Sequence, residues 1–250
     1  MTGPEALLVL LAGLGAGTIN AVVGSGTLLT FPALLAVGYP PVVANVSNNV
    51  GLVGGGLSSV FGYRRELAGQ RARIMRFGTA SLLGGTAGAA LLLVLPDSAF
   101  EAIVPAFIVA ALILIVAQPR LAQRLEKRRR TPSASGPASW LAVLVTGVYG
   151  GYFGAAQDIL LLAFLGIALP DDLQRVNALK NVLATLVNAV SAVVFVIAAH
   201  IAWLPVLLIA VGSTAGAQLG ARYGRRLPEN ILRGVIVVVG LAAVANLLAR

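Results

Sequence analysis

Long apolar stretches alternate with short polar or basic stretches along the whole chain. Ten apolar segments can be distinguished, and eight of them have 17 or more residues. A helix of that length crosses most of a bilayer core of about 30 Å. The other two segments have 12 residues and reach only about 18 Å as helices. The ten segments are 5–23, 27–38, 42–62, 77–95, 102–118, 138–155, 158–169, 176–198, 203–221 and 231–248.

Each short segment follows a polar or glycine-rich break. Gly24–Thr27 reads GSGT and precedes segment 27–38, whereas Gly154–Asp158 reads GAAQD and opens segment 158–169. Irregular backbone at membrane depth is stable only where protein or a wet cavity surrounds it. The pattern therefore predicts two broken or re-entrant helical hairpins, one near the start of each half of the chain.

Basic residues are concentrated in three of the connecting stretches and set the expected orientation. Residues 64–76, 120–130 and 222–226 are rich in Arg and Lys, whereas 96–101 and 199–203 contain neither. The positive-inside rule places the first three stretches in the cytoplasm. Both termini are then expected outside a cytoplasmic (inner) membrane that the chain crosses several times.

Tracing this path gives two halves with the same order of elements in opposite orientation. Asn45 and Asn49 align with Asn177 and Asn181 at a spacing of 132 residues. We therefore predict an all-α polytopic membrane protein with two inverted-topology repeats, each a broken hairpin plus three membrane-spanning helices. The expected parts are residues 1–118, a basic cytoplasmic linker at 119–137, and 138–250. Repeats of this kind place a shared site near the bilayer midplane.

The composition agrees with a membrane protein and excludes several other classes. Hydrophobic residues make up 58% of the 250 residues and charged residues only 11%, with a mean hydropathy of +0.91, too little charge for a soluble surface. The net charge of +9 is explained by the connecting stretches, so we expect no nucleic-acid partner. The chain has no cysteine and one histidine, His200, so we expect neither a cofactor nor a metal.

Polar stripes mark the helices that follow the two hairpins. Asn45, Asn48 and Asn49 fall on one face of segment 42–62, with Gly56 and Ser59 on the same side. A matching stripe on segment 176–198 consists of Asn177, Lys180, Asn181 and Asn188. Such faces turn toward protein or water rather than lipid. They either line a cavity or join helices through hydrogen bonds.

Lys180 lies about one and a half turns inside its segment, where a cation is costly. It could pair with Asp158, attract an anionic substrate, or extend to the cytoplasmic interface. The helix starts after Gly26 and Asp158 direct N–H groups toward the midplane, which favours an anion. The candidate substrate-binding residues are Gly24, Ser25, Gly26, Thr27, Asn45, Asn48, Asn49, Gln157, Asp158, Asn177, Lys180 and Asn181.

The doubled pattern resembles the sulfite exporter TauE/SafE family, within the four-toluene-sulfonate uptake permease superfamily. The stretches that carry the resemblance are Gly24–Gly51 and Gly150–Leu183, and it extends over nearly the whole chain. The chain departs from the family where Ala156 and Asp158 replace common glycines. The resemblance implies a secondary transporter of small anions such as sulfite, thiosulfate or organosulfonates, with export the expected direction. A coupling proton or sodium ion and the lipid bilayer are the other expected partners.

Two other functions compete with a carrier. A channel for anions or small solutes also can oppose two half-helices, but the Asn-Pro-Ala motif of aquaporin-like channels is missing from both breaks. An intramembrane enzyme would need a nucleophile with its base, paired aspartates or a metal motif. None of these is evident in the sequence, so we do not expect an enzyme.

Overall fold

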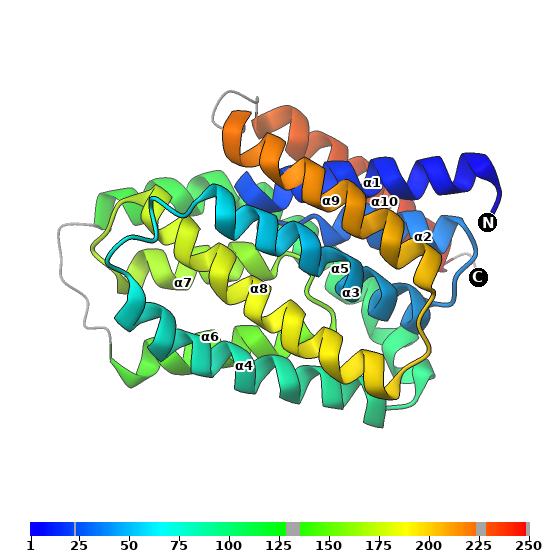
Figure 1. The fold of residues 1–250 in the computed structure, drawn as a ribbon, viewed down its shortest axis with the longest axis horizontal. Coiled ribbons are helices and arrows are strands. Elements are labelled where there is room, and N and C mark those ends of the chain that lie inside the picture. The colour runs from blue at the N-terminus through cyan, green and yellow to red at the C-terminus, as the bar shows by residue number, and fades with distance from the viewer. Residues whose placement is uncertain (23, 129–135, 224–228, 249–250) are drawn as a thin grey trace.

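The computed structural model describes residues 1–22, 24–128, 136–223 and 229–248, and the regular elements of these residues are ten α-helices (Figure 1). The helices are α1 (Gly3–Val22), α2 (Thr27–Ala36), α3 (Pro41–Gly62), α4 (Arg71–Val94), α5 (Asp97–Arg128), α6 (Pro137–Tyr152), α7 (Gln157–Ala168), α8 (Leu173–Ala198), α9 (Trp203–Tyr223) and α10 (Glu229–Leu248).

Each predicted apolar segment corresponds to one helix. The two short segments are helices of 10 residues (α2) and 12 residues (α7). Two helices extend further than hydropathy predicts, since α4 begins at Arg71 and α5 continues to Arg128. Arg and Lys are good helix formers, so a helix continues into basic sequence after its apolar part has ended. The first residues of the expected linker 119–137 are therefore helical, whereas 129–135 lie outside the described residues.

Within the described part of the chain, five helices are long and apolar enough to cross a membrane, namely α1, α4, residues Asp97–Pro119 of α5, α8 and α9. Helix α3 has 22 residues but is not among the five, and its polar stripe lowers its mean hydropathy. With helices as its only described regular elements, the chain is an all-α polytopic membrane protein.

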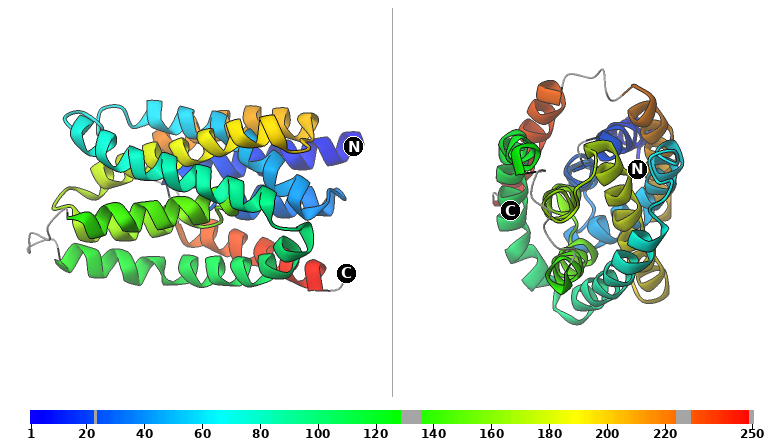
Figure 2. Two further views of the ribbon diagram at one scale, coloured as in Figure 1. Left: turned by 90° about the horizontal axis from the view of Figure 1, so that it is seen from below. Right: turned by 90° about the vertical axis from the view of Figure 1, so that its left-hand side faces the viewer.

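The two hairpins open toward opposite ends of the molecule (Figure 2). Helices α1 and α2 form a hairpin that starts and finishes at the end where both termini lie. Helices α6 and α7 start and finish at the other end, which also carries the α3–α4 and α7–α8 connections. The short helices therefore enter the molecule from opposite sides and meet in its middle.

Helices from one half of the sequence pack against helices from the other half. Helix α1 packs most extensively on α9, and α6 packs in the same way on α4. Helix α9 also packs on α3, and α4 on α8. One group consequently contains α1–α3, α9 and α10, and the other contains α4–α8. The groups meet mainly where α3 crosses α8 and where α5 contacts α10.

Small residues allow the tightest of these contacts. A Cβ atom added to Gly216 would lie 2.0 Å from the carbonyl oxygen of Leu14, across the α1–α9 contact. The corresponding atom on Gly88 would lie 2.0 Å from the carbonyl oxygen of Val148, across α4–α6. Glycine is required at both positions because the backbones touch, which is how helices pack closely in lipid.

Candidate functional site

The two helix breaks have a similar backbone. Helix α1 ends at Val22 and α2 begins at Thr27, while α6 ends at Tyr152 and α7 begins at Gln157. Gly24 has φ of +79° and Gly154 has φ of +78°, in the left-handed region that glycine adopts without a steric penalty. These residues reverse the direction of the chain between the two helices of each hairpin.

The breaks lie directly against each other. A Cβ atom added to Gly24 would come within 2.0 Å of the Cβ atom of Asp158. Asp158 lies in the first turn of α7, directly after the second break. Its side chain is therefore next to the first break as well. The contact places the polar residues of both breaks in one region between α3 and α8.

Lys180 is buried within this region. Its side chain is 0% exposed, so the alternative in which it extends to the interface is excluded. The Nζ atom donates to the backbone oxygen of Asn20 at 3.2 Å and lies 3.4 Å from Oδ1 of Asp158. Lys180 therefore joins α8 to both breaks through one ammonium group.

Asn20 was not among the candidates identified from the sequence, yet it organises the first break. Its Oδ1 atom accepts hydrogen bonds from the backbone N–H groups of Ser25 (3.0 Å) and Gly26 (2.5 Å). These two N–H groups come just before the start of α2, whose own N–H groups we expected to face an anion, and Asn20 satisfies them within the protein. A lone asparagine in an apolar helix, five residues before Ser25, was the available sequence signal.

Asn45 and Asn177 support the breaks in a reciprocal way. Asn45, on α3, donates from Nδ2 to the carbonyl oxygen of Tyr152, the last residue of α6 (2.9 Å). Asn177, on α8, donates to the carbonyl oxygen of Ala21, near the end of α1 (3.2 Å). Carbonyl groups at the end of a helix lack intrahelical partners. Each asparagine thus caps the broken helix of the opposite half.

The other asparagines join α3 to its neighbours. The hydroxyl group of Thr30, on α2, donates to Oδ1 of Asn48. Asn49 donates from Nδ2 to Oδ1 of Asn188 on α8, at 3.4 Å. Both contacts are the interhelical hydrogen bonds that the sequence left as one of two possibilities.

A small polar cavity of about 20 Å³, roughly the space of one water molecule, remains beside Asp158, the ion-pair partner of Lys180. Two buried polar groups on its wall, Nδ2 of Asn181 and Oγ of Ser59, have no hydrogen-bond partner among the described residues. Unpaired buried donors are rare and costly. Its polar lining residues are Asn20, Ser59, Asp158, Asn181, Thr185 and Asn188.

The remaining candidates take supporting positions. Ser25 and Thr27 are buried at the first break. Gln157 is also buried, but its Oε1 atom lies against α6, only 1.9 Å from where a Cβ on Gly150 would stand. Gln157 therefore does not line the cavity, whereas Thr185, which the sequence analysis missed, does.

A larger groove of about 520 Å³ lies elsewhere, between α1, α2 and α10. Its wall consists of apolar side chains such as Leu8, Leu29 and Val239, which suit hydrocarbon rather than an anion. No three acidic or histidine side chains in the described ranges are close enough together to hold a metal ion.

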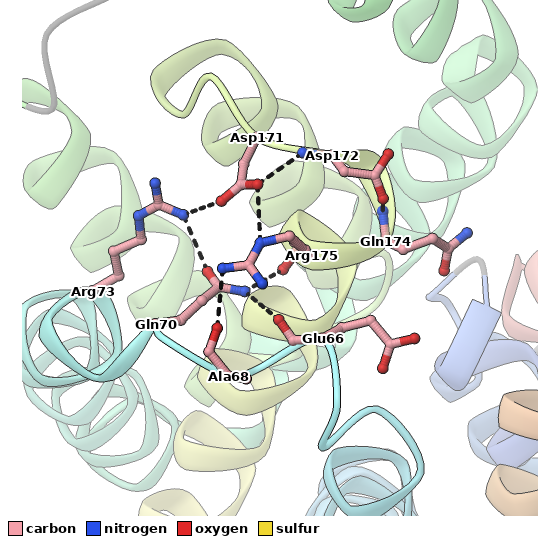
Figure 3. Close-up of polar contacts among 8 residues, drawn as sticks. All are labelled: Glu66, Ala68, Gln70, Arg73, Asp171, Asp172, Gln174 and Arg175. Atoms are coloured by element: carbon pink, nitrogen blue, oxygen red, sulfur yellow. Dashed lines mark hydrogen bonds and ion pairs between the residues drawn. The ribbon is translucent and has the colours of Figure 1, made fainter.

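A second polar network lies at the end of the molecule opposite the termini (Figure 3). Asp171 forms ion pairs with Arg73 and, at 3.0 Å, with Arg175. Gln70 donates to the carbonyl oxygen of Arg175 at 2.9 Å, so the α3–α4 and α7–α8 connections are bound together. Partial burial raises the pKa of Asp171, but hydrogen bonds from Arg73, the Asp172 backbone and Arg175 outweigh it and hold the pKa below its ordinary value.

Comparison with known proteins identifies relatives over nearly the whole chain. The family model described as "Sulfite exporter TauE/SafE" matches residues 9–247. The "Probable membrane transporter protein YfcA" of Escherichia coli K12 is 28% identical over 238 residues, covering 93% of this chain and 86% of the relative.

Two further relatives are also named as probable membrane transporters. The "Probable membrane transporter protein" of Haemophilus influenzae is 27% identical and covers 94% of this chain and 91% of its own length. The "Probable membrane transporter protein ORF9" of a Sinorhizobium species is 28% identical, with coverages of 94% and 88%. No solved structure is significantly similar. The apolar helices, the paired breaks and the family match agree: the chain belongs to the TauE/SafE family of membrane transporters.

Proposed function

We propose that this membrane transporter carries small anions, such as sulfite, thiosulfate or organosulfonates, through a site between its two helix breaks. The single observation that carries the proposal is the environment of Lys180. Its completely buried ammonium group lies 3.4 Å from Asp158, and Asp158 lines a small cavity together with Asn181 and Ser59, each of which has an unpaired polar atom. Such a set of groups suits the oxygen atoms of an anion.

The proposed substrate class follows from this chemistry and from the family. Lys180 supplies the positive charge, and Asn181 supplies two amide N–H donors that no other described residue uses. The matching family model is described as a sulfite exporter, and we therefore propose export as the direction of transport.

The architecture supports transport by alternating access. We propose that residues 1–118 and 138–250 are inverted-topology repeats joined by 119–137. Corresponding helices make the same kinds of contact in both halves, as α1 does with α9 and α6 with α4. A cavity of about 20 Å³ is too small for a sulfonate, so binding requires α3 and α8 to separate. Because basic residues are concentrated at the α3–α4 connection, we place it and the α7–α8 connection bound to it on the cytoplasmic side of a cell membrane.

Flux measurements in lipid vesicles test the proposal. Uptake of sulfite, thiosulfate or methanesulfonate should be saturable, as expected for a carrier rather than a channel. The Asn181→Ala variant should lose at least about tenfold in apparent affinity, since a hydrogen bond to a charged group is worth about 1.5–3 kcal/mol. Arg71→Gln, an exposed cation at the start of α4, is the matched control and should transport normally. Normal transport by Asn181→Ala, or no anion transport at all by the wild type, would refute the proposal.

A further inference from the structure

The charge balance at Lys180 indicates how transport is coupled, given the proposed function on which this inference rests. Lys180 is 0% exposed and Asp158 has a side chain only 15% exposed, and their charged groups are 3.4 Å apart. The pair is therefore neutral as a unit. A net charge in such an environment costs several kcal/mol, whereas a neutral pair avoids most of that cost.

An arriving monoanion disturbs this balance. If it binds at Lys180 while Asp158 stays ionised, one cation faces two anions at membrane depth. Tyr149 and Tyr152, the nearby titratable groups on α6, are neutral phenols and supply no compensating charge. The acidic residues of the packed helix α5, Asp97 and Glu101, line a separate pocket with His200.

We propose that Asp158 is the proton-coupling group, taking up one proton from solution when an anion replaces its carboxylate as the partner of Lys180. The ammonium group then pairs with the anion and the new carboxylic acid is neutral, so the total charge remains zero. The protonated carboxyl group also changes from an acceptor that repels an anion to an O–H donor that can bind it.

The geometry favours Asp158 for this role over other acidic residues. It lies in the first turn of α7 and lines the polar cavity together with Asn181 and Ser59, each of which has an unpaired polar atom. It also lies against Gly24, so it touches both breaks and can respond to their relative movement. Anion and proton would cross together without net charge, so the membrane potential would neither drive nor oppose transport, and export would follow the outward concentration gradient of the anion.

Calorimetry on the purified full chain tests the proposal directly. The probe is methanesulfonate, whose acid group stays ionised throughout the neutral range, so any proton taken up must go to the protein. Titrations in two buffers of different ionisation enthalpy should show uptake of about one proton per anion bound, and affinity should rise about tenfold for each unit that the pH falls. Asp158→Asn should bind methanesulfonate without proton uptake and with little dependence on pH.

Asp97→Asn, which neutralises an acidic residue outside the site, is the matched control and should retain the uptake. Binding of methanesulfonate by the wild type without proton uptake, or binding that depends on sodium instead, would overturn the coupling and leave anion transport standing. Retention of proton uptake by Asp158→Asn would also overturn it. If the wild type binds none of methanesulfonate, sulfite and thiosulfate, the proposed function itself fails.

Discussion

Gly24 and Asp158 are 134 positions apart in the chain, yet their backbones come so close that a methyl group on Gly24 would stand 2.0 Å from the Cβ atom of Asp158. This contact joins the two breaks into one structure. It explains why a residue without a side chain is needed at the first break when the second break carries a carboxylate.

Gly24→Ala should therefore disrupt both stability and transport. In Gly24→Ala the new side chain would have an unfavourable φ of +79° and would also clash with Asp158. In Gly38→Ala the new side chain would have an unfavourable φ of +95° but open space around it. A non-glycine residue in the left-handed region costs about 1–2 kcal/mol. Thermal unfolding in detergent should show a clearly larger loss for Gly24→Ala than for Gly38→Ala, and equal losses would contradict the contact.

Removal of one partner from the buried ion pair should cost more than removal of both. Lys180→Met leaves the carboxylate of Asp158 without its cation, and we expect a loss of about 2–3 kcal/mol, a little below the value for a completely buried pair because Asp158 is 15% exposed. The double variant Lys180→Met, Asp158→Asn should recover part of it. Unfolding measurements on the two single variants and the double variant check this, and additive losses would show that the pair is not coupled.

Two asparagines one turn apart on α8 should have separable roles. Asn177 caps the carbonyl oxygen of Ala21, so Asn177→Ala should lower the stability of the fold by about 1–3 kcal/mol. The amide nitrogen of Asn181 has no partner among the described residues, so Asn181→Ala should leave thermal unfolding nearly unchanged while weakening anion binding. The reverse pattern would mean that the roles are wrongly assigned.

The ion pairs of Asp171 should give a pH-dependent contribution to stability. Because the folded pKa of Asp171 lies below its ordinary value near 4, the contribution is present above that value and disappears as the pH falls through the folded pKa. Asp171→Asn should lower the unfolding temperature at pH 7, with a cost of about 1 kcal/mol or less because both arginines are partly exposed. The difference from the wild type should shrink in acid, and a constant difference would contradict the ion pairs as its cause.

The orientation in the membrane can be tested with single cysteines, since the natural chain has none. Ser98→Cys, exposed near the α4–α5 connection, should react with a membrane-impermeant maleimide in intact cells. Arg65→Cys, exposed in the basic α3–α4 connection, should react only after permeabilisation. Labelling in the opposite order would reverse the assignment of the two sides.

The sequence located both breaks, but it could not assign the polar residues around them. Asn45, Asn177 and Asn181 look alike in sequence, because all three lie on polar faces of apolar helices. Their roles differ because distant segments lie opposite them: a helix-end carbonyl for Asn45 and Asn177, and the cavity for Asn181. Asn20 was missed for the same reason, since its partners are backbone N–H groups brought back by the turn at the break.

The sequence alone determined the number of helices, the two short ones and the polar stripes, because hydropathy, segment length and helical periodicity are local properties of the chain. Tertiary structure alone decided that α1 packs on α9 and α6 on α4, and that Lys180 pairs with Asp158 inside the protein. The physical reason is that these contacts join residues far apart in the chain, and close approach depends on the shapes of both surfaces. A hydropathy pattern reports that a face avoids lipid, but only the packed helices decide which partner it meets.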